Sequence, residues 1–202
     1  MQIQISSETI NRLTRLAHQV PPNEKRKWLR SFFIERRNGH VYAGATNSMF
    51  AAIENIGVQP GDDGFVVINA NGVMFGHDEQ ECTINETTML NWCVVAVDGV
   101  PVSATDAAIR DPEAVNVLSS WRNWFPAQIA EKPGRSMFLD VDGLAALVAT
   151  CPSGRAVLPQ NIDAEQTIVV RDAMSEKWCG VFFARPDRGI FIKGATLPEW
   201  VK

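Results

Sequence analysis

The residues of this chain best suited to do chemistry are the basic side chains of its first 57 positions. That segment holds 8 Lys and Arg residues against 4 Asp and Glu residues, a balance of +4. Residues 58–135 hold 4 against 11 and residues 136–202 hold 7 against 8, and the whole chain has a net charge of −4. Because the local field governs contact more than the distant total charge, a positive face on this acidic protein can attract phosphate.

Sequence motifs for catalysis, nucleotide binding and metal binding do not occur in the chain. Neither GxGxxG nor GxxxxGK[ST] is present, so nucleotide-phosphate binding has no support. The sequence His77-Asp78 with Glu79 and Glu81 is more simply a solvated acidic loop than a metal site. We therefore expect a protein that is not an enzyme and has no cofactor, although spacing alone leaves open a site assembled from distant residues.

We expect the four cysteines to be free thiols that pack as small apolar groups. Cys82, Cys93, Cys151 and Cys179 form no CxxC pair, and no histidine lies at zinc-finger spacing from them. A Cys82–Cys93 disulfide is the alternative, and it would be unusual in a reducing compartment. The sequence has no apolar run of the roughly 18 residues that a membrane helix needs and does not begin like a signal peptide, which predicts a cytoplasmic protein.

The first basic residues fall on a predicted amphipathic helix. Residues 2–6 alternate like a strand, and Ser6 or Ser7 can cap the helix that follows to Val20, where Pro21-Pro22 ends it. At 100° per residue the apolar side chains gather on one side. This side holds Ile10, Leu13, Leu16, Ala17 and Val20. The polar side holds Asn11, Arg12, Thr14, Arg15, His18 and Gln19.

Strand patterns follow this helix. After the basic connection Lys25-Arg26-Lys27, residues 28–37 and 40–46 read as a hairpin around the turn Asn38-Gly39. Further strands are predicted at 49–56, 65–69 and 73–75, with a loop at 59–64.

The rest of the chain mixes strand and helix patterns. Residues 78–86 are acidic, and strands are predicted at 90–97, 100–103, 137–141, 167–171, 178–184 and 190–193. Helices are predicted at 112–125, with Pro112 in its first turn, and at 142–151. Trp121, Trp124 and Phe125 could form an interface patch, but core packing is the simpler interpretation.

One strand–helix–strands pattern therefore occurs twice, which predicts a pseudo-symmetric α+β domain. Residues 1–69 form the first half and residues 136–202 the second. Residues 70–135 are an acidic insertion or connection with one helix, and the whole chain is expected to be one compact domain.

Two segments resemble the DNA polymerase sliding-clamp family. The first is Ser31-Phe-Phe-Ile-Glu-Arg-Arg-Asn-Gly-His-Val-Tyr-Ala-Gly-Ala-Thr-Asn47 with the strand at 49–54, and Asn47 stands where the bacterial clamp has Asp. The second is Thr167-Ile-Val-Val-Arg-Asp172 with Trp178-Cys-Gly-Val-Phe-Phe-Ala-Arg185. It is similar to the closing hairpin of a clamp chain but lacks its proline. The resemblance implies two βαβββ halves with both helices on one side of a curved antiparallel sheet.

The resemblance also implies a function. The helices of a clamp face duplex DNA, and their Lys and Arg side chains contact phosphates without reading bases. The corresponding DNA-binding candidates in this sequence are Arg12, Arg15, His18, Lys25, Arg26, Lys27 and Arg155. Ala145 and Ala149, the exposed positions of the second predicted helix, carry no charge. Implied partners are double-stranded DNA, a DNA polymerase or another protein, and further copies of the chain.

Two other interpretations compete with a clamp-like DNA-binding function. Arg12 and Arg15 can be solvated charges on the polar face of a helix, and a three-residue basic run is too short for a nucleic-acid motif. The second hypothesis is a phage- or plasmid-encoded interaction or inhibitor protein that keeps a clamp-like scaffold and binds a host protein. The acidic segment 58–135 favours it, because acidic surfaces engage nucleic-acid-binding proteins. Under the clamp hypothesis, we expect the protein to be a divergent phage-type relative of sliding clamps that acts in a bacterial host cell.

Overall fold

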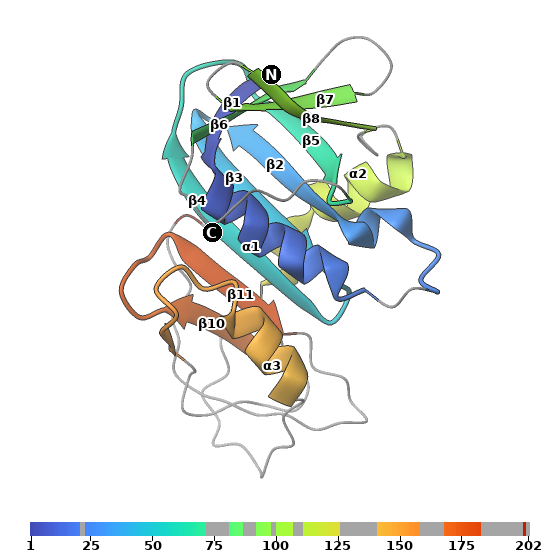
Figure 1. Cartoon of the computed structure of the whole chain (residues 1–202). Coiled ribbons are helices and arrows are strands. Elements are labelled where there is room, and N and C mark those ends of the chain that lie inside the picture. The colour runs from blue at the N-terminus through green and yellow to red at the C-terminus, as the bar shows by residue number, and fades with distance from the viewer. Residues whose placement is uncertain are drawn as a thin grey trace. The chain divides into compact units, whose positions relative to one another are not determined.

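The structure is a computed structural model, shown in Figure 1, and it describes residues 1–20, 23–71, 81–86, 92–97, 100–106, 111–125, 141–157, 168–182 and 200. The chain divides into two compact units. The first comprises Met1–Asn47 and Ile53–Ser119, and the second comprises Ser48–Ala52 and Ser120–Lys202. The predicted strands at 73–75, 137–141 and 190–193 lie outside the described residues, except that Val141 begins a helix.

The first unit begins with the predicted strand and helix. Strand β1 spans Gln2–Ser6, and helix α1 spans Ser7–His18. The Ser6 hydroxyl accepts a hydrogen bond from the Thr9 amide at 3.2 Å, so Ser6 is the N-cap. All five apolar residues predicted to face the core are buried. The N-terminal boundary of the helix and its apolar side are therefore confirmed, whereas the helix ends at His18, two residues before the predicted end at Val20.

Four strands form the main sheet of this unit. They are β2 (Ser31–Arg37), β3 (His40–Thr46), β4 (Phe50–Val58) and β5 (Gly64–Asn69), in the order β5-β2-β3-β4. Asn38 and Gly39 have φ angles of 51° and 76°, as a two-residue type I′ hairpin requires. The predicted start of β2 at Trp28 is wrong. Lys27–Arg30 form a 3₁₀ helix, η1, because the Leu29 amide bonds back to the Arg26 carbonyl at 3.1 Å.

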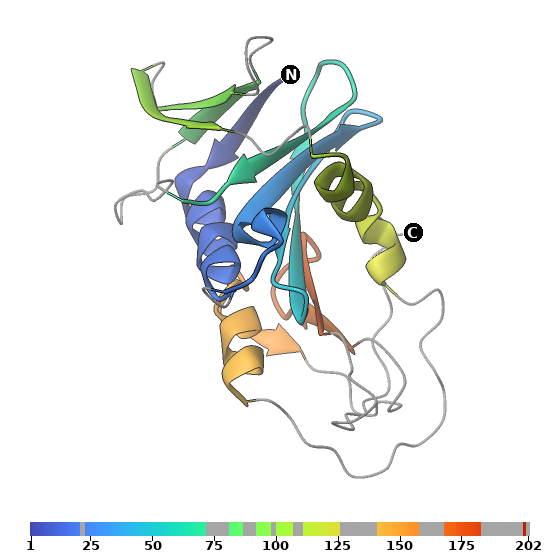
Figure 2. The same cartoon turned by 90° about the vertical axis from the view of Figure 1, so that its right-hand side faces the viewer.

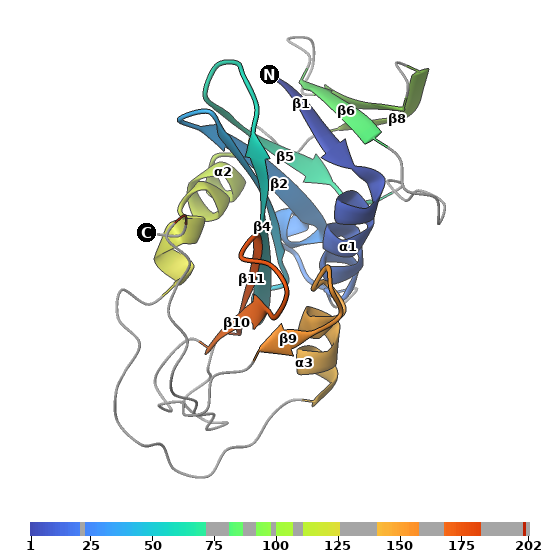
Figure 3. The ribbon, with the colours of Figure 1, turned by 90° about the vertical axis from the view of Figure 1, so that its left-hand side faces the viewer.

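Helices cover both faces of the main sheet. Helix α1 contacts β2 and β3, and helix α2 (Pro112–Ser119) contacts β5 on the opposite face (Figures 2 and 3). The side chains of Phe33 and Ile53 lie so close to Gly44 that a Cβ atom there would be 2.6 Å from Phe33 and 2.5 Å from Ile53. The predicted helix 112–125 is too long. It ends at Ser119, and Trp121–Trp124 form a separate 3₁₀ helix, η3.

A second antiparallel sheet in the first unit has the order β1-β6-β7-β8. Its later strands are β6 (Glu81–Glu86), β7 (Trp92–Val97) and β8 (Val100–Asp106). Strand β6 lies within the acidic segment, where the sequence pattern showed no strand. Its alternate residues Cys82 and Ile84 are buried opposite Ile5 and Ile3. Cys82 forms no disulfide and pairs in register with Val97, whereas Cys93 pairs with Glu86 at the other end of the hairpin. The alternative disulfide is therefore wrong.

The second unit contains one described α-helix and a short sheet. Helix α3 spans Val141–Val148, and strands β9 (Ala156–Val157), β10 (Ile168–Asp172) and β11 (Trp178–Phe182) lie in the order β11-β10-β9. The predicted helix at 142–151 is confirmed with an earlier start and an earlier end, and the strand predicted at 167–171 is confirmed with a shift of one residue. The strand predicted at 178–184 is confirmed as far as Phe182, and residues 183–184 lie outside the described residues. Strand β9 was not predicted. Among the described helices of both units, none is long and apolar enough to cross a membrane.

Candidate nucleic-acid interface

Two basic side chains stand free on the solvent side of α1. Arg15 and His18 are exposed and lie three residues apart, so they project from neighbouring turns of one helix face. Neither side chain makes a hydrogen bond or ion pair with another residue in the described part of the chain. We call Glu8, Arg15 and His18 the outer face of α1. Arg15 can meet a phosphate without first breaking an ion pair within the described part of the chain, whereas Glu8 on the same face is paired with Arg12.

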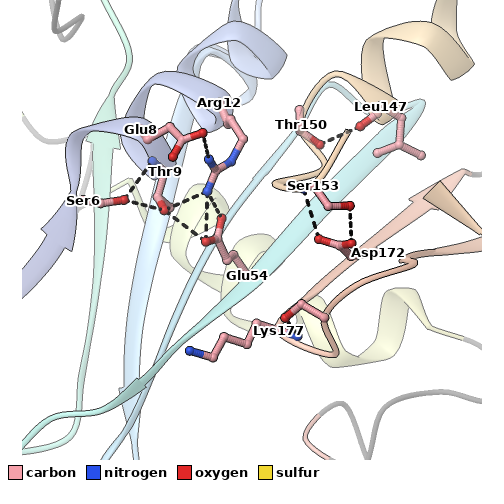
Figure 4. A network of polar contacts seen from close by, with 11 residues as sticks. Ser6, Glu8, Thr9, Arg12, Glu54, Leu147, Thr150, Ser153, Asp172 and Lys177 are labelled. Carbon is pink, nitrogen blue, oxygen red and sulfur yellow. Dashed lines mark hydrogen bonds and ion pairs between the residues drawn. The ribbon is translucent and has the colours of Figure 1, made fainter. Parts of the chain in front are cut away.

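Arg12 lies elsewhere, and its predicted place on the exposed polar side is wrong. It is only 7% exposed, and its Nη2 atom donates to both Glu54 carboxylate oxygens at 3.0 and 2.9 Å (Figure 4). The same nitrogen lies 3.0 Å from the Thr9 hydroxyl, and Nη1 lies 2.9 Å from Glu8. A buried guanidinium needs such partners, because leaving it unpaired would cost several kcal/mol. Arg12 therefore holds α1 to β4, and burial keeps its guanidinium from reaching a phosphate, although Nε has no hydrogen-bond partner among the described residues.

The basic connection after α1 is partly neutralised. Lys25 and Arg26 are both exposed. Arg26 donates to Glu24 from Nε at 2.9 Å and from Nη2 at 2.8 Å, and its guanidinium lies 5.7 Å from the Trp28 ring centre. These hydrogen bonds from Arg26 lower the pKa of Glu24 to about 2. Lys25 has no side-chain partner among the described residues. The side chain of Lys27 lies outside them.

The second unit provides one predicted cation. Arg155 is exposed in the turn before β9, and its side chain has no partner within the described ranges. Ala145 and Ala149 are exposed on α3, as predicted, so this helix surface adds no charge at those positions. Arg155 is therefore the single predicted DNA-binding residue of this unit.

A polar cluster in the second unit has catalytic residue types, but its geometry is that of a turn. Asp172 accepts hydrogen bonds from the Ser153 hydroxyl and from the Ser153 amide at 3.3 Å (Figure 4). It also accepts one from the Met174 amide at 2.8 Å. Burial opposes the charge, yet these hydrogen bonds lower the pKa of Asp172. Burial also raises the pKa of the Cys151 thiol, which suppresses the nucleophilic thiolate. The cluster therefore joins the turn after α3 to the end of β10.

The described ranges also contain no candidate metal site, because no group of three or more His, Cys, Asp or Glu residues lies close enough together there. The sequence interpretation missed Glu54, which decides the role of Arg12. Glu54 directly follows the apolar stretch Phe50-Ala-Ala-Ile53 of a strand, and this position was the available signal in the sequence. Its partner lies 42 residues earlier in the chain, a pairing that no local pattern records.

Solved structures show the same fold as this chain. It is similar to a DnaN sliding clamp (DNA polymerase III subunit beta) from Pseudomonas aeruginosa, with a TM-score of 0.63 at 12% identity over 92% of this chain. A second P. aeruginosa clamp structure gives 0.62 at 11% identity, and the Caulobacter crescentus sliding clamp gives 0.51 at 9% identity over 99% of this chain. The predicted clamp-like α+β fold is confirmed at this level.

The likeness is one of fold, and the lengths differ. The chain spans 65% and 66% of the two P. aeruginosa clamp chains and 67% of the C. crescentus one. No family model and no curated protein sequence matches it.

Proposed function

We propose that this protein is a non-catalytic accessory factor of DNA replication that resembles a sliding clamp and contacts the backbone of duplex DNA. The observation that carries the proposal is the outer face of α1, where Arg15 and His18 are exposed and have no side-chain partner among the described residues, on a scaffold similar to DnaN sliding clamps. Lys25 extends the same basic segment along the chain.

Few cations are available, so the contact is weak and independent of sequence. Neutralising two or three phosphates gives a slope of log affinity against log salt of about −2 to −3. A contact of this kind carries no base readout, because phosphate oxygens are the same at every step of the duplex. Weak backbone contact suits a protein that must move along DNA while it holds a partner there.

Retention on DNA then needs more than one chain. The chain is shorter than the clamps that it resembles, and we propose that it associates with further copies or with a polymerase-type partner in the cytoplasm of a bacterial host. Light scattering with a nicked circular duplex and with the same DNA linearised tests this step. A closed oligomer stays on the circle and leaves the linear form, whereas a monomer indifferent to DNA contradicts it.

Charge reversal on α1 tests the DNA contact itself. We expect Arg15→Glu to weaken binding of a fluorescent duplex by about tenfold at low salt and to flatten the salt dependence, because one phosphate contact is lost and a repulsion is added. Arg37→Glu is the matched control, since Arg37 is also exposed in the first unit but lies on β2. Equal weakening by both variants would mean that only net charge matters, and the α1 assignment would fail.

The second hypothesis, an interaction or inhibitor protein on the same scaffold, is favoured by the acidic balance of residues 58–135. Salt titration separates the two. Duplex binding that weakens steeply with salt supports the replication factor. Tight binding to a basic protein without measurable duplex affinity supports the inhibitor.

A further inference from the structure

Strand β1 is the outer strand of its sheet, and side chains cover the edge that faces away from β6. It pairs with β6 on one side, and Gln4 lies opposite Thr83 in that ladder. In an antiparallel pair, alternate residues turn their N–H and C=O groups away from the neighbouring strand. Gln2 and Gln4 do so here, and we call their outward backbone groups the β1 edge. Such an edge is a template for another chain unless it is covered.

Gln59 covers this edge in the manner of a neighbouring strand. Its Oε1 accepts from the Gln4 amide at 2.9 Å, and its Nε2 donates to the Gln4 carbonyl at 2.6 Å. One side-chain carboxamide therefore satisfies both outward groups of Gln4, as a peptide group of a paired strand would. At Gln2 the carbonyl accepts from Arg36 Nη2.

The covered edge borders a cavity of about 590 Å³, which falls in the size range of ligand sites. Arg36 lines it at only 4% exposure, and its Nε atom has no hydrogen-bond partner in the described part of the chain. Asp62 and Asp63 also line the cavity and are exposed to solvent. The site thus combines a backbone-recognising edge, a buried donor and two exposed carboxylates, of which Asp63 already accepts a hydrogen bond from the Asn38 amide at 2.8 Å.

The side chain of Gln59 can leave the β1 edge while the main chain of its segment stays in place. Gly57 and Gly61 bracket it with φ angles of 115° and 130°, a region that side chains rarely adopt. The Gln59 amide donates to the Gly39 carbonyl at 2.9 Å, which anchors the main chain while the side chain stays half-exposed. The carboxamide is therefore held by two exchangeable hydrogen bonds and can be replaced by an equivalent group.

We propose that the β1 edge is a docking site for an extended segment of a partner protein, which displaces the Gln59 carboxamide and pairs with Gln4. Strand addition of this kind takes its affinity from main-chain hydrogen bonds and its specificity from side-chain pockets. Charge complementarity to Asp62 and Asp63 selects a segment with a Lys or Arg beside the paired stretch. This site is separate from the outer face of α1, so it adds a protein partner to the proposed DNA contact.

Titration of ¹⁵N-labelled protein with the peptide acetyl-Lys-Thr-Val-Thr-Val-Lys-amide tests the proposal. We expect saturable shifts at the Gln4 backbone amide and at the Gln59 side-chain amide. Gln59→Ala removes the internal competitor and should tighten binding by about tenfold. Gln19→Ala, an exposed glutamine at the end of α1, is the matched control and should leave the affinity unchanged.

Two further arms identify what is recognised. A peptide with proline in place of both valines cannot donate at those positions and should not bind, and Asp62→Asn should weaken the lysine peptide but not one with threonine at its ends. Absence of shifts at Gln4, equal binding of the proline peptide, or an unchanged affinity in Gln59→Ala would overturn the proposal. So would dimerisation of Gln59→Ala through this edge without peptide binding. Arg15→Glu should bind the peptide normally, which separates this test from that of DNA binding.

Discussion

Helices α1 and α3 show how differently two helices on one chain can use their exposed sides. Helix α1 buries an apolar face, holds one arginine inside and presents Arg15 and His18 to solvent. Helix α3 is shorter, buries Leu147 and exposes alanines. The contrast indicates that charge on α1 is available for a ligand, whereas the described surface of α3 serves mainly to cover its own sheet.

The largest expected effect comes from the buried charge of α1. Arg12→Ala should lower the free energy of unfolding by about 4 kcal/mol, because it leaves the mostly buried Glu54 without its partner. Arg15→Ala, three residues away on the same helix, should change it by less than about 0.5 kcal/mol. Urea unfolding followed by circular dichroism measures both. Similar losses for the two variants would remove the distinction between an internal and an outer arginine.

In the second unit the corresponding effect is one of packing. Leu147 is fully buried, and a Cβ atom at Gly180 would lie 2.7 Å from its Cδ1 atom. Leu147→Ala should therefore cost about 3 kcal/mol of unfolding free energy. The half-buried Leu144 on the same helix is the control, and Leu144→Ala should cost about 1 kcal/mol. Equal costs in thermal or urea unfolding would show that α3 does not cover its sheet through Leu147.

Acid should affect the turn that joins α3 to β10. Hydrogen bonds to Asp172 outweigh the effect of burial and lower its pKa in the folded state. A lowered pKa means that the carboxylate stabilises the fold above its unfolded pKa near 3.9, and that this contribution is lost as the pH falls through the folded value.

Asp172→Asn should accordingly show a smaller loss of urea resistance between about pH 6 and pH 3 than the unmodified protein. Asp62→Asn, which alters an exposed carboxylate in the first unit, should keep the full loss. An unchanged pH dependence in Asp172→Asn would contradict the assignment.

The smallest expected effect tests whether α3 can be made to act like α1. Introducing Ala145→Arg together with Ala149→Arg should raise duplex affinity a few-fold at low salt and steepen the salt slope by about 2. Ala173→Arg with Met174→Arg, placed on the exposed turn after β10, is the control with the same added charge. If both pairs raise affinity equally, the gain reflects net charge, and α3 has no special position toward DNA.

Local sequence determined much of the first unit. The Ser6 cap, the apolar spacing of α1 and the Asn38-Gly39 turn each depend on residues a few positions apart, so pattern alone located the strand, the helix and the hairpin. The same locality explains the errors at Trp28 and after Ser119. There, apolar and aromatic residues suit several backbone conformations, and short-range hydrogen bonds selected 3₁₀ turns.

Only tertiary structure decided which polar residues are available for function. Arg12 and Arg15 were both predicted on the polar side of the helix. Arg12 is buried because it pairs with Glu54, 42 residues later in the chain, whereas Arg15 remains exposed. Strand β6 forms in an acidic segment because β1 supplies its partner, and Gln59 acquires its role because it meets Gln4 55 residues earlier in the chain. Burial and pairing depend on groups brought together from distant positions, so a pattern read over neighbouring residues does not contain them.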